Sequence, residues 1–172
     1  MSDNDTRTNQ FWVLIEEAWR SRGAAANDER RALATRDSDE DDIDTQGVDD
    51  ALGDVIAYLT ERFNAMPQDE LVAMDRVLER KLYDIDRQEI QEATDGSDDG
   101  FLYARGYIVI LGKEFYEAVN ANPAKAIMGA ECEDVCYLPA HIHANRFGGD
   151  FPKHDDGISR ESCSNRAGWP DL

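Results

Sequence analysis

The sequence predicts an all-α fold, in which about five to six helices form a compact bundle around a buried central helix. Large apolar residues recur at steps of three and four along successive segments, which is the spacing of one helix face. Two of these segments open with residues that favour a helix start, Pro67 and Ser97. With 172 residues the chain can bury one substantial core, and we expect residues 1–147 to form a single domain.

The first two predicted helices cover residues 11–19 and 48–63. Arg22 and Gly23 end the first, and Asp49 in the first turn of the second complements the helix dipole. The apolar residues at helical spacing are Phe11, Trp12, Leu14, Ile15 and Trp19 in the first helix, and Val48, Leu52, Val55, Ile56, Leu59 and Phe63 in the second.

Residues 24–47, between these helices, lose the helical periodicity and contain a dense acidic block. Like charges so close together repel one another, and such blocks are typical of disordered segments. We therefore expect a disordered acidic insert here. The acidic residues of the block are Asp37, Asp39, Glu40, Asp41, Asp42 and Asp44.

The third helix and the central helix have the clearest start signals. Pro67 fits the first position of the third helix, and apolar residues follow at helical spacing to Ile85. Ser97 can cap the central helix through its hydroxyl, and apolar residues continue on nearly all faces to Phe115. A short buried strand over residues 107–111 is the alternative, because this stretch is β-branched and aromatic and lies between two glycines.

Two weaker helical segments follow, at residues 123–128 and 131–147, the second bent or stopped near Pro139. From Gly148 onwards the composition shifts to glycine, serine and proline. We therefore expect residues 148–172 to form a loop-like C-terminal tail.

The chain is strongly acidic, with a formal net charge of -19 and an isoelectric point near 4.3. Binding to nucleic acid or to an anionic membrane depends on Lys and Arg neutralising phosphate, so this charge argues against both. It favours a basic protein partner. The alternatives are a surface that only keeps the protein in solution, the composition of a high-GC or salt-adapted genome, and carboxylates that mimic nucleic acid.

The three cysteines, Cys132, Cys136 and Cys163, are odd in number and confined to the last quarter of the chain, so they do not form a disulfide framework. The first residues lack a basic segment followed by an apolar one, and no apolar run approaches the roughly 18 residues of a membrane span. These features indicate a soluble protein of the reducing cytoplasm.

Three segments carry a family resemblance: residues 11–16 (Phe-Trp-x-Leu-Ile-Glu), the helix start at residues 67–76, and residues 97–106, with Ser-Asp-Asp-Gly-Phe-x-Tyr-x-Arg-Gly. Together they resemble an uncharacterised bacterial family catalogued as domain of unknown function 4240. The resemblance runs from about Phe11 to about Phe147 and implies a compact helical domain. It implies no established catalytic residue, cofactor or substrate.

The start of the central helix is the first candidate site. Paired carboxylates can divide acid and base roles or hold a hard metal cation, and the two aspartates here could also form a polar site with Arg105 or Arg87. Capping by Ser97 and stabilisation of the helix dipole by the two aspartates explain the same residues without a ligand. For Arg105 we expect an ion pair with a carboxylate, that of Asp75 or of an aspartate in the site itself. The site consists of Ser97, Asp98, Asp99, Tyr103 and Arg105.

Cysteines and histidines offer a second candidate, a zinc site. The spacing Cys-x3-Cys followed by His-x-His is not that of a zinc finger, and Pro139 interrupts a helix that could align the ligands. Packing cysteines and surface histidines are therefore the simpler interpretation. A Cys–His nucleophile is disfavoured, because the acidic residues nearby would raise the pKa of the thiol. The four residues are Cys132, Cys136, His141 and His143.

Since no specific catalytic or nucleotide-binding motif is present, the sequence favours a non-enzymatic interaction domain, such as an adaptor, an inhibitor or an immunity-type protein. We expect this domain to engage a basic partner and to require no cofactor. A small-ligand or catalytic site at the start of the central helix is the alternative.

Overall fold

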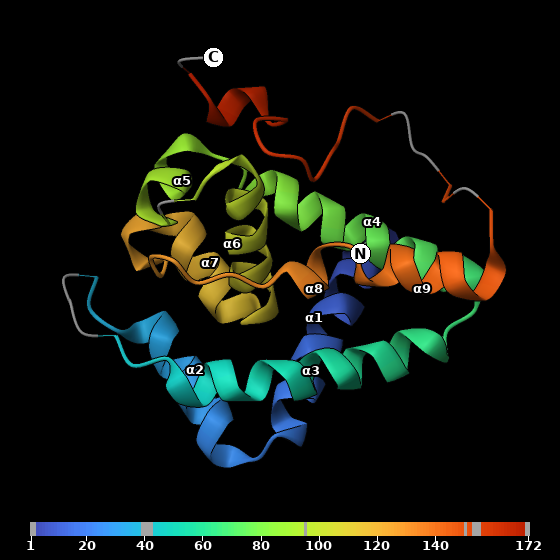
Figure 1. The fold of residues 1–172 in the computed structure, drawn as a ribbon, viewed down its shortest axis with the longest axis horizontal. Helices are drawn as coiled ribbons and strands as arrows, with labels where there is room; N and C mark the ends of the chain where they lie inside the picture. Colours follow the sequence, from blue (N-terminus) through green and yellow to red (C-terminus); the bar gives the residue numbers. More distant parts are fainter. Residues whose placement is uncertain (1–2, 39–42, 95, 150, 153–155, 171–172) are drawn as a thin grey trace.

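The computed structural model describes residues 3–38, 43–94, 96–149, 151–152 and 156–170. Within these ranges all regular secondary structure is helical, which confirms the predicted all-α class (Figure 1). The α-helices are α1 (Asp3–Ser21), α2 (Ala24–Thr35), α3 (Gln46–Asn64), α4 (Gln68–Asp84), α5 (Gln88–Thr94), α6 (Asp98–Ile110), α7 (Lys113–Ala121), α8 (Glu133–Cys136) and α9 (Leu138–Phe147), and the 3-10 turns are η1 (Pro123–Lys125) and η2 (Arg166–Gly168).

The central helix α6 is buried on almost all sides, as the sequence predicts. It contacts α4, α5, α7 and α8, and every residue from 101 to 110 except Tyr103 is buried. The alternative of a strand over residues 107–111 is wrong, because α6 continues to Ile110. Gly106 lets α8 approach closely, since a methyl group there would lie 2.4 Å from the carbonyl oxygen of Cys132.

Gly112 ends the helical run that the sequence predicts to reach Phe115. Its φ of 92° lies in the left-handed region, which glycine adopts without steric cost. A side chain at this position would also meet Nη1 of Arg30 at 2.4 Å. The predicted single helix is therefore two helices, α6 and α7, joined at this glycine.

Residues 24–35 form α2, so the prediction of a disordered insert over residues 24–47 is wrong for this part. The inner face of α2 is mostly polar, with Asn27, Arg30 and Leu33 buried. Arg30 reaches across to Glu16 on α1 and to the end of α6, so tertiary contacts hold a segment that lacks an apolar stripe. Residues 39–42 of the acidic block lie outside the described ranges.

Several later elements differ in detail from the prediction. The helix α5 was not predicted, and residues 123–128, which were predicted to be helical, contain only the turn η1. The segment 131–147 forms two helices, α8 and α9, with Tyr137 between them. Pro139 lies in the first turn of α9, where a missing backbone N–H costs no hydrogen bond, so it fits a helix start and not a bend.

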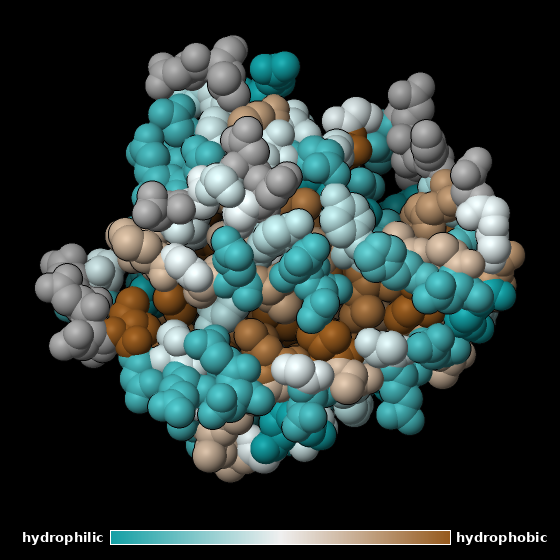
Figure 2. All heavy atoms as spheres, in the orientation of Figure 1, coloured by the Kyte–Doolittle hydropathy of each residue, from teal (hydrophilic) through white to brown (hydrophobic). Residues whose placement is uncertain are grey.

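The described tail is largely irregular, as predicted, but residues 158–169 pack against the bundle. Trp169 is buried, with its ring 5.9 Å from that of Phe101 between centroids. On the face shown in Figure 2, hydrophilic side chains cover most of the surface, and hydrophobic ones lie in a band between α3 and α8. None of the described helices has the length and apolar character needed to cross a bilayer.

Candidate functional site

The predicted site at the start of the central helix begins with a helix cap. The hydroxyl of Ser97 accepts a hydrogen bond from the backbone N–H of Gly100 at 3.3 Å, which confirms the predicted N-cap. The side chains of Asp98 and Asp99 lie outside the described part of the structure. Tyr103 is half-buried, and its carbonyl accepts from the backbone N–H of Cys132 at 2.9 Å.

Arg105, the cation of this predicted site, is fully buried. It donates to the carbonyl of Leu82 at 2.9 Å and to the hydroxyl of Ser162 at 3.1 Å, and its guanidinium lies 4.7 Å from the ring centroid of Phe101. Desolvation by burial lowers its pKa, against the opposing effect of the Asp86 charge. The guanidinium therefore faces the protein interior, and Asp75, one expected partner, pairs with a tail arginine instead.

The four predicted zinc ligands are not brought together. The thiol of Cys136 points at the carbonyls of Leu102 and Cys132, both at 3.5 Å, whereas His141 is exposed and stacks on Tyr137. The buried His143 contacts Gln68 through Nε2 at 3.0 Å. Among the described residues, no three histidine, cysteine or acidic side chains converge to hold a metal ion.

Burial also makes the two buried thiols unreactive. It raises the pKa of Cys136 to about 12, with a further rise from the neighbouring Cys132, and raises the pKa of Cys132 to about 11. Both thiols are therefore protonated at neutral pH, and a thiol in this state is a poor nucleophile and a poor metal ligand.

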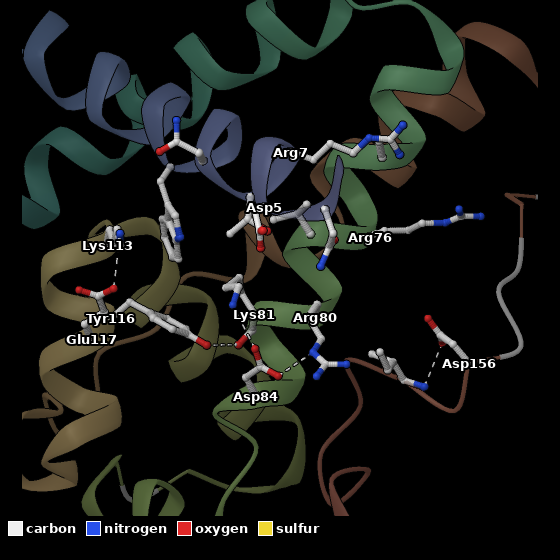
Figure 3. A pocket seen from close by; sticks show the side chains of 17 residues that line it. Asp5, Arg7, Arg76, Arg80, Lys81, Asp84, Lys113, Tyr116, Glu117 and Asp156 are labelled. Atoms are coloured by element: carbon white, nitrogen blue, oxygen red, sulfur yellow. Dashed lines mark hydrogen bonds and ion pairs between the residues drawn. The ribbon is translucent and has the colours of Figure 1, made fainter. Parts of the chain in front are cut away.

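A groove of about 1000 Å³ lies between α1, α4, α7 and two tail residues, Asp156 and Ile158 (Figure 3). Its charge balance differs from that of the chain as a whole. Five basic and four acidic side chains line it, whereas the full sequence has 18 basic and 37 acidic residues. The basic residues are Arg7, Arg76, Arg80, Lys81 and Lys113, and the acidic ones are Asp5, Asp84, Glu117 and Asp156.

Three arginines form a row along one side of this groove. Figure 3 shows Arg7 from α1 and Arg76 and Arg80 from α4 spaced along α4, with their side chains extending to the same side of the view; the segment that carries Asp156 lies on this side, next to Arg80. The two arginines of α4 are four residues apart, so helix geometry puts them on one face. Arg80 pairs through Nε with Asp84 at 2.8 Å, whereas Nε of Arg76 is buried with no hydrogen-bond partner among the described residues.

The inner end of the groove is built from aromatic side chains. The rings of Trp12 and Tyr116 lie 5.2 Å apart between centroids, and the Tyr116 hydroxyl donates to the carbonyl of Lys81 at 3.0 Å. The ammonium group of Lys81 lies 5.6 Å from the Tyr116 ring centroid and pairs with Asp84 at 3.0 Å. These contacts fix the lysine and α4 relative to α7.

The sequence did not predict this groove, because its residues come from three helices and from the tail. The one local signal is the pair Arg76 and Arg80, which lies at helical spacing on the side of α4 away from its apolar residues. This spacing is also typical of an ordinary solvent-exposed face, so the sequence alone does not distinguish the two.

Residues 6–142 match the model of a family described as "Protein of unknown function (DUF4240)". The chain belongs to this family. The match confirms the predicted resemblance and includes all three arginines of the row, whereas the residues from the tail that line the groove, Asp156 and Ile158, lie beyond it. No curated protein and no solved structure matches the chain.

Proposed function

We propose that this chain is a non-enzymatic binding protein whose groove holds a small ligand that carries phosphate or carboxylate groups. The row of Arg7, Arg76 and Arg80 is the observation that carries this proposal. The planar guanidinium group offers donors in a fork that matches two oxygens of a carboxylate or phosphate. A volume of about 1000 Å³ is at the upper end for small-molecule sites, so the groove has room for more than one anionic group.

The negative charge of the whole chain does not prevent such binding. At physiological ionic strength the Debye length is about 8 Å, so exposed carboxylates farther than this from the ligand are largely screened. Contacts at hydrogen-bond distance inside the groove are screened much less. Binding therefore depends on the nearest side chains. Of the two arginines from α4, Arg80 uses its Nε to pair with Asp84, whereas the Nε of Arg76 has no hydrogen-bond partner among the described residues.

Arg76→Gln tests this function. We expect inorganic pyrophosphate or citrate to bind the wild-type protein saturably, as measured by calorimetry and by NMR shifts of residues in the groove. The two probes separate a phosphate ligand from a carboxylate one. Loss of a charged fork should weaken binding at least about tenfold, equivalent to about 1.4 kcal/mol.

Arg20→Gln is the matched control, because Arg20 is an exposed arginine of α1 that does not line the groove. This variant removes the same charge and should leave the affinity for pyrophosphate or citrate unchanged. Equal weakening by the two variants, or no saturable binding of either probe by the wild-type protein, would contradict the proposed function.

A second function, binding of a basic protein, is supported by an acidic surface at the start of α3. The carboxylate of Glu29 on α2 lies so close to Gly47 that a methyl group added to this glycine would overlap it. Three exposed aspartates lie near Gly47 in sequence: Asp44, Asp49 and Asp50. Among the described residues, three arginines and two aspartates are buried and add little to the outer surface; they are Arg30, Arg105, Arg160, Asp75 and Asp86. The outer surface therefore keeps the strongly acidic balance of the sequence, and electrostatic attraction would speed association with a basic partner.

Charge reversal tests this second function. The variant Glu29→Lys/Asp50→Lys should lose a basic protein that the wild type retains from a lysate of the native host at low salt and releases at high salt. The variant Glu89→Lys/Glu114→Lys has the same net charge but changes exposed residues on α5 and α7. Retention of the same partner by all three proteins would exclude the α3 surface as its binding site.

A further inference from the structure

The described tail segment, residues 158–169, is held on the bundle by buried polar contacts. Its Arg160 is 6% exposed and donates through Nη2 and Nη1 to the two carboxylate oxygens of Asp75 on α4, at 2.6 and 3.3 Å. Nη1 also donates to the carbonyl of Cys136, and the guanidinium lies 5.0 Å from the ring centroid of Tyr137. Glu79 adds a second carboxylate, 3.5 Å from Nε. The bundle thus surrounds this one side chain with acceptors and an aromatic face.

Asp86 provides a second anchor for the same segment. It is fully buried, and its Oδ1 accepts from the backbone N–H of Cys163 at 3.1 Å and from Nε1 of Trp169 at 3.0 Å. Its Oδ2 accepts from the backbone N–H of Asn165 at 2.9 Å. All three donors belong to residues 158–169, and Arg105 adds a bond from the bundle to Ser162. We call these groups of the bundle the Asp75–Asp86 surface: Asp75, Glu79, Asp86, Arg105 and the carbonyl of Cys136.

The contacts between residues 158–169 and the bundle are mainly polar and specific, as in recognition of a peptide segment, and not mainly apolar, as in a hydrophobic core. Moving a carboxylate and a guanidinium out of water costs free energy, which their mutual attraction offsets only when the geometry is good. A buried carboxylate such as that of Asp75 therefore favours a segment with an arginine over one without. The Asp75–Asp86 surface lies within residues 6–142, which match the family model, whereas the segment that occupies it lies beyond this match. The surface thus belongs to the part of the chain that matches the family, and the segment that occupies it does not.

We propose that the Asp75–Asp86 surface is a recognition site for an arginine-bearing segment of a basic protein, and that residues 158–169 are its internal occupant. The partner segment carries an arginine for Asp75 and, nine residues later, a tryptophan for Asp86, as this chain does at Arg160 and Trp169. Two copies of a chain with a net charge of -19 repel each other, which favours a basic protein over a second copy. The site borders the groove, because Ile158 at the start of its occupant also lines the groove, but its own residues are not among those that line the groove.

The test starts from the full chain, with a protease site inserted between Gly148 and Gly149. Both glycines are exposed, and an added methyl group at either would meet no atom within 4 Å. Cutting the folded protein removes the tether, which otherwise keeps the occupant at an effective concentration near the millimolar range. We then add a fluorescent peptide of residues 156–172 and measure binding by anisotropy, while circular dichroism and mass measurement follow the fold and the particle size.

We expect the peptide to replace the cut tail saturably. A peptide with Arg160→Ala should bind at least about tenfold more weakly, because it lacks the fork held by Asp75. A peptide with Arg166→Ala is the matched control, since the side chain of Arg166 is exposed, and should bind as well as the unchanged peptide. Weakening by Arg160→Ala alone would support the proposal.

Three outcomes would overturn it. A cut tail that never exchanges, or a bundle that unfolds when the tail leaves, would make residues 158–169 a permanent part of the fold. Equal binding of the Arg160→Ala peptide would show that the arginine is not recognised. Stable particles of two uncut chains joined through this surface would identify the occupant as a second copy and not a basic partner.

Discussion

We expect Arg30→Ala to lower the free energy of unfolding by about 3–5 kcal/mol, because it breaks a buried ion pair from one side. The Arg30 side chain is 1% exposed and donates to both carboxylate oxygens of Glu16, at 2.9 and 2.8 Å. It also donates to the carbonyl of Leu111 at 2.8 Å and lies 5.4 Å from the ring centroid of Trp19. The alanine variant would leave a partly buried carboxylate and a buried carbonyl without their donor.

Arg31→Ala is the matched control for this prediction. Arg31 is the next residue of α2, and its Nη2 lies 3.7 Å from the same Glu16 carboxylate, but its side chain is 48% exposed. Exposed ion pairs contribute about 0–1 kcal/mol, so we expect only a small loss. Chemical denaturation measures both losses, and hydrogen exchange reports whether α2 opens first. Similar losses for the two variants would contradict an anchoring role for Arg30.

The pH dependence of stability provides an independent check on the same ion pair. Burial alone would raise the pKa of Glu16, but the hydrogen bond and charge of Arg30 outweigh it and hold this pKa below its ordinary value. A carboxyl group with a lowered folded pKa stabilises the fold above its unfolded pKa, and this stabilisation is lost as pH falls through the folded pKa. Stability measured from neutral pH to about pH 3 should therefore fall less steeply in Arg30→Ala than in the wild type.

The helix α2 shows why part of this fold could not be predicted from the sequence. Its buried residues, Asn27, Arg30 and Leu33, do follow a helical step of three. Two of the three are polar, so a search for apolar periodicity passes over them. What makes their burial favourable is the carboxylate of Glu16 and the carbonyl of Leu111, and the latter is 81 residues away in sequence. By contrast, α1, α3 and α4 carry their own apolar stripes and were predicted as helices, although α1 begins at Asp3, eight residues before its predicted start.

In the candidate site, too, contacts between residues close in sequence could be predicted and contacts between distant residues could not. The Ser97 cap could be predicted because its donor, the N–H of Gly100, lies only three residues away. The groove and the Asp75–Asp86 surface could not, because each joins residues from several elements; Arg160 and Asp75, for example, are 85 residues apart. The burial of Arg105 was equally hidden, since its acceptors lie 23 and 57 residues away. Local sequence patterns thus predicted the helices, whereas contacts between residues far apart in sequence decide where a ligand can bind.

A second large effect is expected at the tail, where Asp75→Asn should lower the free energy of unfolding by about 3 kcal/mol. The variant keeps the shape of the side chain but leaves the guanidinium of Arg160 buried without its bidentate carboxylate. The loss should lie near the lower end of the range for broken buried pairs, because Glu79 remains 3.5 Å from Nε of Arg160. Chemical denaturation measures it, and Asp69→Asn, an exposed aspartate of the same helix, should cost less than about 1 kcal/mol.

The pKa of Glu79 tests whether the loss of stability in Asp75→Asn comes from the lost charge pair or from packing alone. Burial raises the pKa of Glu79 above its ordinary value, and the charge of Asp75 adds to the rise against the opposing charge of Arg160. A raised folded pKa gives stability that is present below the unfolded pKa and lost as pH rises through the folded pKa. Asp75→Asn removes the repelling charge and leaves Glu79 as the main partner of Arg160, so an NMR titration should find a lower pKa for Glu79. An unchanged or higher pKa, together with a large loss of stability, would mean that Asp75 acts through packing and that its charge is not what holds the tail.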